Sequence, residues 1–359
     1  MKKYKLKSDL LANPNQKLWL GIDVHKVNLH VTVLDDEGET VLSQSVPHKK
    51  EHVVGLIRRL NSTQITAVYE AGPTGYKLVT WLKELGCEAF MCPPTHVRQR
   101  RGGRIKTDAR DSKTLAEQAR ANMLPAVHLL DEEVYRQRQI TRTREQLARH
   151  RSQLKTQIKS LLLFHGITCP EDLKPNWSKV FIKWLEQEAA DDPNLSLAIN
   201  ALLRAHASMD EEIKALDARL REIEASKRWA KNAALLRSIP GVGALTAMVV
   251  LLESGDLSRF DNGEELANWI GLVPTEWSSG EGQHRGSITR AGNKRVRTAL
   301  VEASWMVVRN DAAMKAVYER IKKRRGAGKA IVAVARRLAL IIRAMLRDQQ
   351  PFEYQTATT

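Results

Sequence analysis

The sequence predicts an α/β domain of about 125 residues, followed by two mainly helical regions. Short runs rich in β-branched residues, separated by turn-prone segments, fill the N-terminal part and are typical of strands. Strand signals stop near residue 131, where long stretches with apolar residues every three or four positions begin. From residue 229 glycine-containing loops interrupt the helical pattern. We therefore expect three regions and a frayed tail, at 1–125, 126–228, 229–348 and 349–359.

The expected elements of the first region follow a definite order. They are strands at 17–24, 28–35 and 39–46, a helix at 51–61, a strand at 65–70, a helix at 75–86 and a strand at 87–92. A last helix begins near Thr107 or Asp108, since either can cap its N-terminus. Three strands, then helix, strand, helix, strand and helix, is the order expected of a ribonuclease H-like α/β fold.

The middle region reads as a helical arm. Two long amphipathic stretches, 132–166 and 195–226, flank a proline-broken one at 177–194. Apolar residues at three- and four-residue spacing with charged faces between them predict an antiparallel coiled-coil or helical-hairpin arm, whose usual role is dimerisation or spacing. We interpret the charges first as a solvated face, but the arginine-rich segment 136–151 leaves contact with nucleic acid open as a second role.

Charge points to a polyanionic partner. The 359 residues carry 57 Lys and Arg against 41 Asp and Glu, a formal net charge of +16. Such a surplus favours binding to phosphates, although a basic protein without a specific partner would show it too. The three cysteines have no CxxC spacing, and neither a signal peptide nor a membrane-spanning run is present, so we expect a cytoplasmic protein with no membrane partner.

Four carboxylates stand where they can converge. Asp23 and Glu70 end the first and fourth expected strands, which are neighbours in this fold. Asp108 and Asp111 lie three residues apart on the following helix, and therefore on one face of it. Together they predict a site for two Mg²⁺ ions, or Mn²⁺ in their place, as in phosphoryl-transfer enzymes. Taken singly, a strand-end aspartate is more often a turn residue and a pair of aspartates on a basic helix more often forms salt bridges.

Basic residues lie directly before the aspartate pair. We expect them to hold backbone phosphates near the metal ions. They are Arg98, Arg100, Arg101, Arg104 and Lys106. Among the ten histidines only His25, beside Asp23, is of interest, and a structural role is expected for it rather than ligation.

The segments GIDVHK, YEAGPTGY and KTDARDSKTLA resemble the DEDD motifs of insertion-sequence transposases with a RuvC-like N-terminal domain. That family includes the pilin-gene inverting recombinase and bridge-RNA-guided recombinases. The resemblance implies a DNA transposase that cleaves and rejoins strands. It further implies a guide RNA that pairs with donor and target DNA, dimers that assemble into a tetramer, an active site shared between protomers, and a location beside the bacterial nucleoid.

A second resemblance covers the C-terminal region. GLVPTEWSSG, followed by HRGSITRAGNKRVRTALVEA, is similar to the C-terminal domain of the same family, whose proposed nucleophile falls on Ser279, next to Ser278. A serine on a glycine-flanked loop is accessible, and an ester to phosphorus would conserve the bond energy needed for rejoining. Without the resemblance, a Ser-Ser-Gly loop is more often a linker.

Further candidates for phosphate contact lie in the third region. SIPGVGALTA resembles a helix-hairpin-helix turn, in which Gly241 and Gly243 let backbone N–H groups face a DNA phosphate, although a structural turn reads almost the same. Arg290, Lys294, Arg295 and Arg297 follow the serine loop and are either phosphate contacts or a solvated basic face. RGAGKA, at 325–330, lacks the pattern of a nucleotide-binding loop.

Two rival functions remain open. One is a metal-dependent, structure-specific DNA nuclease resembling a Holliday-junction resolvase, in which water replaces the serine. The other is a non-catalytic nucleic-acid-binding protein whose carboxylates form structural salt bridges.

Overall fold

The computed structural model describes residues 14–98, 107–188, 192–279 and 282–353. The chain divides into two compact units, Met1–Leu129 and Leu130–Thr359, which we call the N-terminal and C-terminal units. Every strand and helix expected in the N-terminal unit is present, with bounds that differ from expectation by at most two residues. They are β1 (Lys17–Val24), β2 (Asn28–Leu34), β3 (Thr40–Pro47), α1 (Lys50–Leu60), β4 (Gln64–Glu70), α2 (Lys77–Glu84), β5 (Glu88–Cys92) and α3 (Asp108–Arg120).

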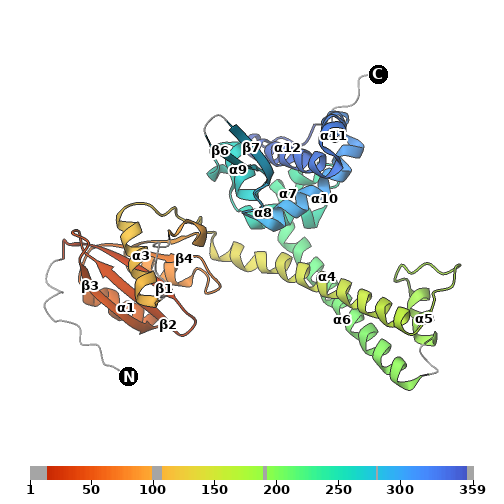
Figure 1. The fold of residues 1–359 in the computed structure, drawn as a ribbon, viewed down its shortest axis with the longest axis horizontal. Coiled ribbons are helices and arrows are strands. Elements are labelled where there is room, and N and C mark those ends of the chain that lie inside the picture. The colour runs from red at the N-terminus through yellow and green to blue at the C-terminus, as the bar shows by residue number, and fades with distance from the viewer. Residues whose placement is uncertain (1–13, 99–106, 189–191, 280–281, 354–359) are drawn as a thin grey trace. The chain divides into compact units, whose positions relative to one another are not determined.

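The five strands form one sheet in the order β3-β2-β1-β4-β5 (Figure 1). β1 pairs antiparallel with β2 and parallel with β4, and β4 pairs parallel with β5. This mixed sheet, with helices after it, is consistent with the ribonuclease H-like fold.

Side-chain alternation along the strands produces two different faces. Leu20, Ile22 and Tyr69 are buried in the larger core of the unit, which also contains apolar residues of α1 and α2. On the other face Val68 and Cys92 pack with Leu115 of α3. One helix layer therefore covers each face of the sheet, and α3 lies over the side to which odd-numbered residues of β1 point.

Helix α3 lies on β1 in backbone contact. A Cβ atom added to Gly21 would lie 1.9 Å from the carbonyl oxygen of Ser112, so only glycine permits this approach. The Ser112 hydroxyl also shares a buried 2.7 Å hydrogen bond with Thr32 of β2. These contacts fix the first turn of α3, where Asp108 and Asp111 lie, relative to the end of β1.

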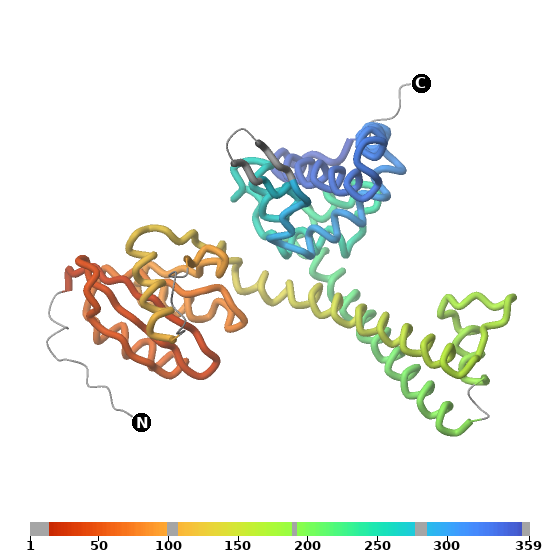
Figure 2. The backbone as a smooth tube through the Cα atoms, in the orientation of Figure 1, coloured from red at the N-terminus to blue at the C-terminus, as the bar shows by residue number. Residues whose placement is uncertain are grey.

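The C-terminal unit begins with a pair of long helices, α4 (Glu132–Phe164) and α6 (Pro193–Glu224), that run alongside each other (Figures 1 and 2). Their ion pairs show the direction: Arg144 bonds to Asp217, whereas Arg151, farther along α4, bonds to Asp210, earlier on α6. The two helices are thus antiparallel. At their far end Ile158 and Ile199 pack with Phe181 of α5 (Lys179–Glu188).

The remaining elements form a helical domain within the same unit. They are α7 (Ala230–Arg237), α8 (Ala244–Ser254), α9 (Gly263–Ile270), β6 (Pro274–Ser279), β7 (Gly282–Ile288), α10 (Lys294–Asn310), α11 (Ala312–Arg325) and α12 (Ala327–Asp348). Leu251 of α8, Leu300 of α10 and Leu338 of α12 belong to its core. Among the described residues, no helix combines the length and apolarity that a membrane span requires.

Candidate metal centre and nucleic-acid interface

Three side chains with metal-ligating atoms meet where β1 approaches the start of α3. Nε2 of His25 lies 3.2 Å from a carboxylate oxygen of Asp23 and 3.6 Å from one of Asp108. One ligand atom from each of the three residues lies within 4.8 Å of the others. Asp23 is mostly buried, whereas His25 and Asp108 are more than half exposed. An ion entering from solvent could therefore reach all three.

Glu70 stands beside this cluster on the neighbouring strand. The parallel register of β1 with β4 pairs Ile22 with Tyr69, so Asp23 and Glu70 come next on strands about 4.8 Å apart and point to the same face. The charge of Glu70 affects Cys92 on the neighbouring strand. Burial raises the pKa of the Cys92 thiol to about 12, and the nearby carboxylate of Glu70 contributes to this rise. Glu70 is not in the group of three whose ligand atoms converge within 4.8 Å.

Electrostatics at Asp23 favour a cation. Burial raises the pKa of the Asp23 carboxyl above its usual range, the Asp108 and Asp111 carboxylates raise it further, and His25 opposes them. Burial and like charge both disfavour the ionised form, and a divalent ion would relieve both. Carboxylate oxygens suit Mg²⁺ and Mn²⁺, whereas an imidazole nitrogen is a ligand typical of transition metals, so the residues present fit Mg²⁺ and, with His25 as a ligand, a transition metal such as Mn²⁺.

The sequence did not predict that His25 would lie close to both Asp23 and Asp108. Its spacing of two from Asp23 on a strand end was visible, but the approach of Asp108, 83 residues later, depends on how α3 packs. The structural role expected for it and ligation to an ion both fit its position between two carboxylates.

The two candidate serines lie at the end of a strand. Ser278 and Ser279 close β6, and Ser279 pairs with Gly282 of β7 in an antiparallel hairpin. The sequence suggested a glycine-flanked loop for these serines, and the structure has both of them in strand β6, directly before the turn. The orientation of the side chains from 277 to 285 lies outside the described part of the structure.

Comparison with known proteins covers both regions. One family model, described as "Transposase", matches residues 20–166, and another, "Transposase IS116/IS110/IS902 family", matches residues 233–319. The protein y4qE of Sinorhizobium fredii is 31% identical over 81% of this chain and 72% of its own length. The chain belongs to the IS116/IS110/IS902 transposase family.

Two further transposase relatives match at nearly full length. The transposase for insertion sequence element IS1533 of Leptospira borgpetersenii is 26% identical over 94% of this chain and 97% of its own length. The transposase for IS1111A of Coxiella burnetii is 26% identical over 93% and 90%. Asp23, Glu70, Asp108 and Asp111 fall within the first matched range of this transposase, and Ser279 falls within the second.

Of the basic residues predicted to hold phosphate beside the carboxylates, the structure describes one. Arg98 is exposed, and its backbone N–H and C=O are both hydrogen-bonded by the side chain of Gln118 on α3. Arg100, Arg101, Arg104 and Lys106 lie outside the described residues. Phosphate binding by this segment of the transposase stays a prediction.

The turn between α7 and α8 of the transposase uses its glycines differently. Gly241 has a φ of +80°, and a Cβ there would lie 2.3 Å from the Cβ of Met306 on α10, so close packing accounts for it. Gly243 caps the N-terminus of α8, is exposed and has no neighbour within 4 Å of an added Cβ. Gly241 is therefore explained by packing against α10, whereas no packing contact accounts for Gly243.

The four cations after the hairpin divide into two pairs. Arg295 donates to Glu145 of α4 at 2.6 Å, and Arg297 donates to the carbonyl of Ile270 at 2.6 Å, so both have partners within the chain. Arg290 and Lys294 are exposed. Of the four, these two are the more accessible to a phosphate.

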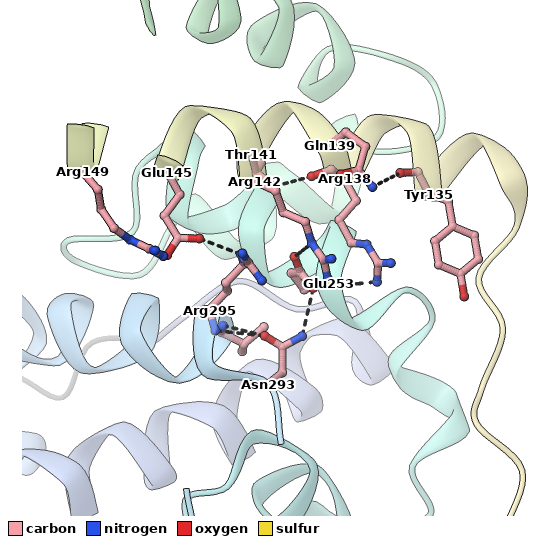
Figure 3. A network of polar contacts seen from close by, with 11 residues as sticks. Tyr135, Arg138, Gln139, Thr141, Arg142, Glu145, Arg149, Glu253, Asn293 and Arg295 are labelled. Atoms are coloured by element: carbon pink, nitrogen blue, oxygen red, sulfur yellow. Dashed lines mark hydrogen bonds and ion pairs between the residues drawn. The ribbon is translucent and has the colours of Figure 1, made fainter. Parts of the chain in front are cut away.

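A buried carboxylate joins the arm to the residue that caps the N-terminus of α10 (Figure 3). Glu253 of α8 accepts hydrogen bonds from Arg142 Nε and Nη2 at 2.7 and 2.8 Å, and from Asn293 Nδ2 at 3.0 Å. Burial would raise the pKa of Glu253, but the hydrogen bonds from Arg142 and Asn293 hold it below its usual range. The arginine-rich face of α4 is thus partly engaged within the chain, which its local sequence did not reveal.

Proposed function

We propose that this chain is a DNA transposase in which Asp23, Glu70, Asp108 and Asp111 bind Mg²⁺ or Mn²⁺ and Ser279 attacks the scissile phosphate. The observation that carries the metal proposal is the convergence of Asp23, His25 and Asp108 within 4.8 Å, beside Glu70 on the adjacent strand. His25 is added to the proposed ligand set.

A divalent ion in this site would neutralise charge that develops on the phosphate oxygens. Asp23 would hold it from the sheet, and Asp108 from the start of α3. The Ser279 oxygen would form an ester bond to phosphorus while the bond from phosphorus to one deoxyribose oxygen breaks. The serine proton passes to a base, and the departing oxygen takes up a proton. Reversal with a different deoxyribose hydroxyl rejoins strands without ATP.

Other parts of the proposal rest on the family resemblance and on charge. The resemblance implies a composite site in which the metal cluster of one protomer acts with the serine hairpin of another. Pairing of the α4–α6 arms would supply dimers and then a tetramer. A structured guide RNA is compatible with the net charge of +16.

A covalent protein–DNA adduct tests the serine. Wild type incubated with DNA carrying the element's ends and Mn²⁺ or Mg²⁺ should yield a denaturation-resistant adduct, with or without added flanking RNA. Ser279→Ala should abolish the adduct, whereas Ser278→Ala, the matched control, should retain it. An adduct lost only in Ser278→Ala would move the nucleophile by one residue.

The same assay separates the rivals. The metal cluster lies wholly within the N-terminal unit, which favours a hydrolytic nuclease as the second candidate. Equal cleavage by wild type and Ser279→Ala, with free ends and no adduct, would establish that function instead. Asp108→Asn should retain DNA binding but stop cleavage. If metal ions have no effect on any DNA product, the carboxylates are structural and the catalytic proposal fails.

A further inference from the structure

A groove of about 710 Å³ lies beside the base of the serine hairpin. β7 contributes Gly286, Ser287 and Ile288, and the opposite wall comes from α11 and the first three turns of α12. The segment RGAGKA, which is not a nucleotide-binding loop, forms one end of it. The groove is an open one and belongs entirely to the C-terminal unit.

The lining is strongly basic. Six cationic side chains face the groove, and no Asp or Glu lines it: they are Arg290, Arg320, Arg324, Arg325, Lys329 and Arg336. Within the described part of the chain only Arg336 of these six forms an ion pair, with Glu264. Like charges gathered in a concave surface repel one another and create a local positive potential that attracts anions.

Local stability does not explain all of these charges. Arg324 and Arg325 end α11, where the helix dipole favours cations, so their presence alone would indicate nothing. Lys329, in contrast, lies in the first turn of α12, where the helix dipole disfavours a cation. Arg290 has a φ of +55°, a backbone conformation that is unfavourable for an L-residue other than glycine. Lys329 is thus present as a cation, and Arg290 as a side-chain-bearing residue, at positions where the local structure disfavours them.

The apolar residues of the groove indicate which part of a nucleic acid it can bind. Its floor is apolar, with Leu272, Ile288, Ile321 and Val332, and no aromatic residue is among the lining side chains. Bases therefore have no ring to stack on, whereas sugars can pack on the floor and phosphates can reach the basic rim.

We propose that this groove binds the sugar–phosphate backbone of the DNA strand that Ser279 attacks, independently of base sequence. The inference rests on the proposed function for its position along the strand. Ser279 lies five residues beyond Pro274, which lines the groove. Five strand residues span about 17 Å, equal to about five nucleotides of B-form DNA. The contacted phosphates therefore lie within about five nucleotides of the scissile one.

Salt dependence of DNA binding tests the groove without any reaction. The full-length variant Arg320→Gln/Arg324→Gln/Lys329→Gln is compared with wild type on a short random duplex in EDTA, by fluorescence anisotropy. The slope of log affinity against log salt should become shallower by about 2 to 3, because each phosphate contact contributes about 0.9. The loss of affinity should be the same for every DNA sequence.

A matched control removes the same charge elsewhere. Arg58, Arg59 and Lys83 are exposed on α1 and α2, and their triple Gln variant should leave the slope unchanged. Exchanging the groove cations conservatively, Arg320→Lys/Arg324→Lys/Lys329→Arg, should restore the slope if the Gln variant fails through charge and not through misfolding. Equal losses in groove and control variants, or no loss in the groove variant, would overturn the proposal.

Two further experiments test whether the bound strand is DNA and whether it is the strand that is cleaved. A single-stranded RNA of the same sequence is titrated in parallel, and a loss confined to RNA would overturn the assignment to DNA. In the adduct assay, neutral methylphosphonates within about five nucleotides of the cleavage site should lower the adduct yield of wild type but not that of the groove variant. If no adduct forms while the EDTA slope still changes, the serine proposal fails and the groove stands as a DNA site.

Discussion

Replacement of Gly21 by alanine should displace α3 and with it Asp108 and Asp111 of the proposed metal site. The new Cβ would lie 1.9 Å from the Ser112 oxygen and 2.4 Å from the Ala116 nitrogen, both backbone atoms that cannot rotate away. Ordinary contact begins near 3.4 Å, so the helix must shift by about 1.5 Å. Overpacking of this kind costs about 1–3 kcal/mol of unfolding free energy.

The same shift moves Asp108 away from Asp23. A misplacement of about 1 Å in a catalytic centre can lower the rate about 100-fold, so Gly21→Ala should lose at least that factor in metal-dependent DNA cleavage. Urea unfolding measures the stability, and calorimetric titration with Mn²⁺ measures the site itself in the folded variant.

Gly55→Ala is the matched control. Gly55 lies within α1, and no atom lies within 4 Å of an added Cβ, so alanine should raise stability by about 0.5–1 kcal/mol and leave Mn²⁺ binding unchanged. If Gly21→Ala is as stable as wild type and binds Mn²⁺ equally well, the account of α3 as a helix held in place by close contact is wrong.

Buried groups give three further predictions. Glu253→Gln should lower the unfolding free energy by about 3–5 kcal/mol in urea titrations, because Arg142 loses its buried counter-charge. Since the folded-state pKa of Glu253 is depressed, the stability advantage of wild type should be present at neutral pH and vanish in acid, and an advantage that does not depend on pH would contradict this account. Asp23→Asn should raise the unfolding free energy of the metal-free protein near neutral pH, because the raised pKa of Asp23 means that its charged form opposes folding. The gain should shrink as the pH falls through that pKa, and a loss of stability instead would favour the rival in which the carboxylates form structural salt bridges. Cys87 and Cys92 should react with maleimide only on unfolding, since burial raises their pKa values to about 11 and about 12, and rapid labelling of native protein would refute this.

The N-terminal unit could be predicted from sequence because its signals are local. Each strand is a short apolar run that ends in turn residues, and the element order then places Asp23 beside Glu70. Proximity of Asp108 required only that α3 cover the sheet, which the fold class supplies. The position of His25 between two carboxylates needed the packing distance itself.

The C-terminal unit was harder to predict for physical reasons. β6 and β7 consist largely of polar residues and glycine, so their pairing depends on the ladder and not on a buried apolar face. Arg142 and Glu253 are 111 residues apart, and nothing in the spacing around either one specifies the other. Likewise, the basic groove joins residues of β7, α11 and α12 that carry no common motif.

Glu253 also determines where the long helical arm can bend. Its side chain has no exposed surface, and its hydrogen bonds come from α4 on one side and from Asn293 on the other. Tilting α4 at its root would strip the donors from a charge that water cannot reach, a change that costs several kcal/mol. Asn293 caps the N-terminus of α10, so a displacement of α4 at this point would be transmitted through Glu253 to the start of α10.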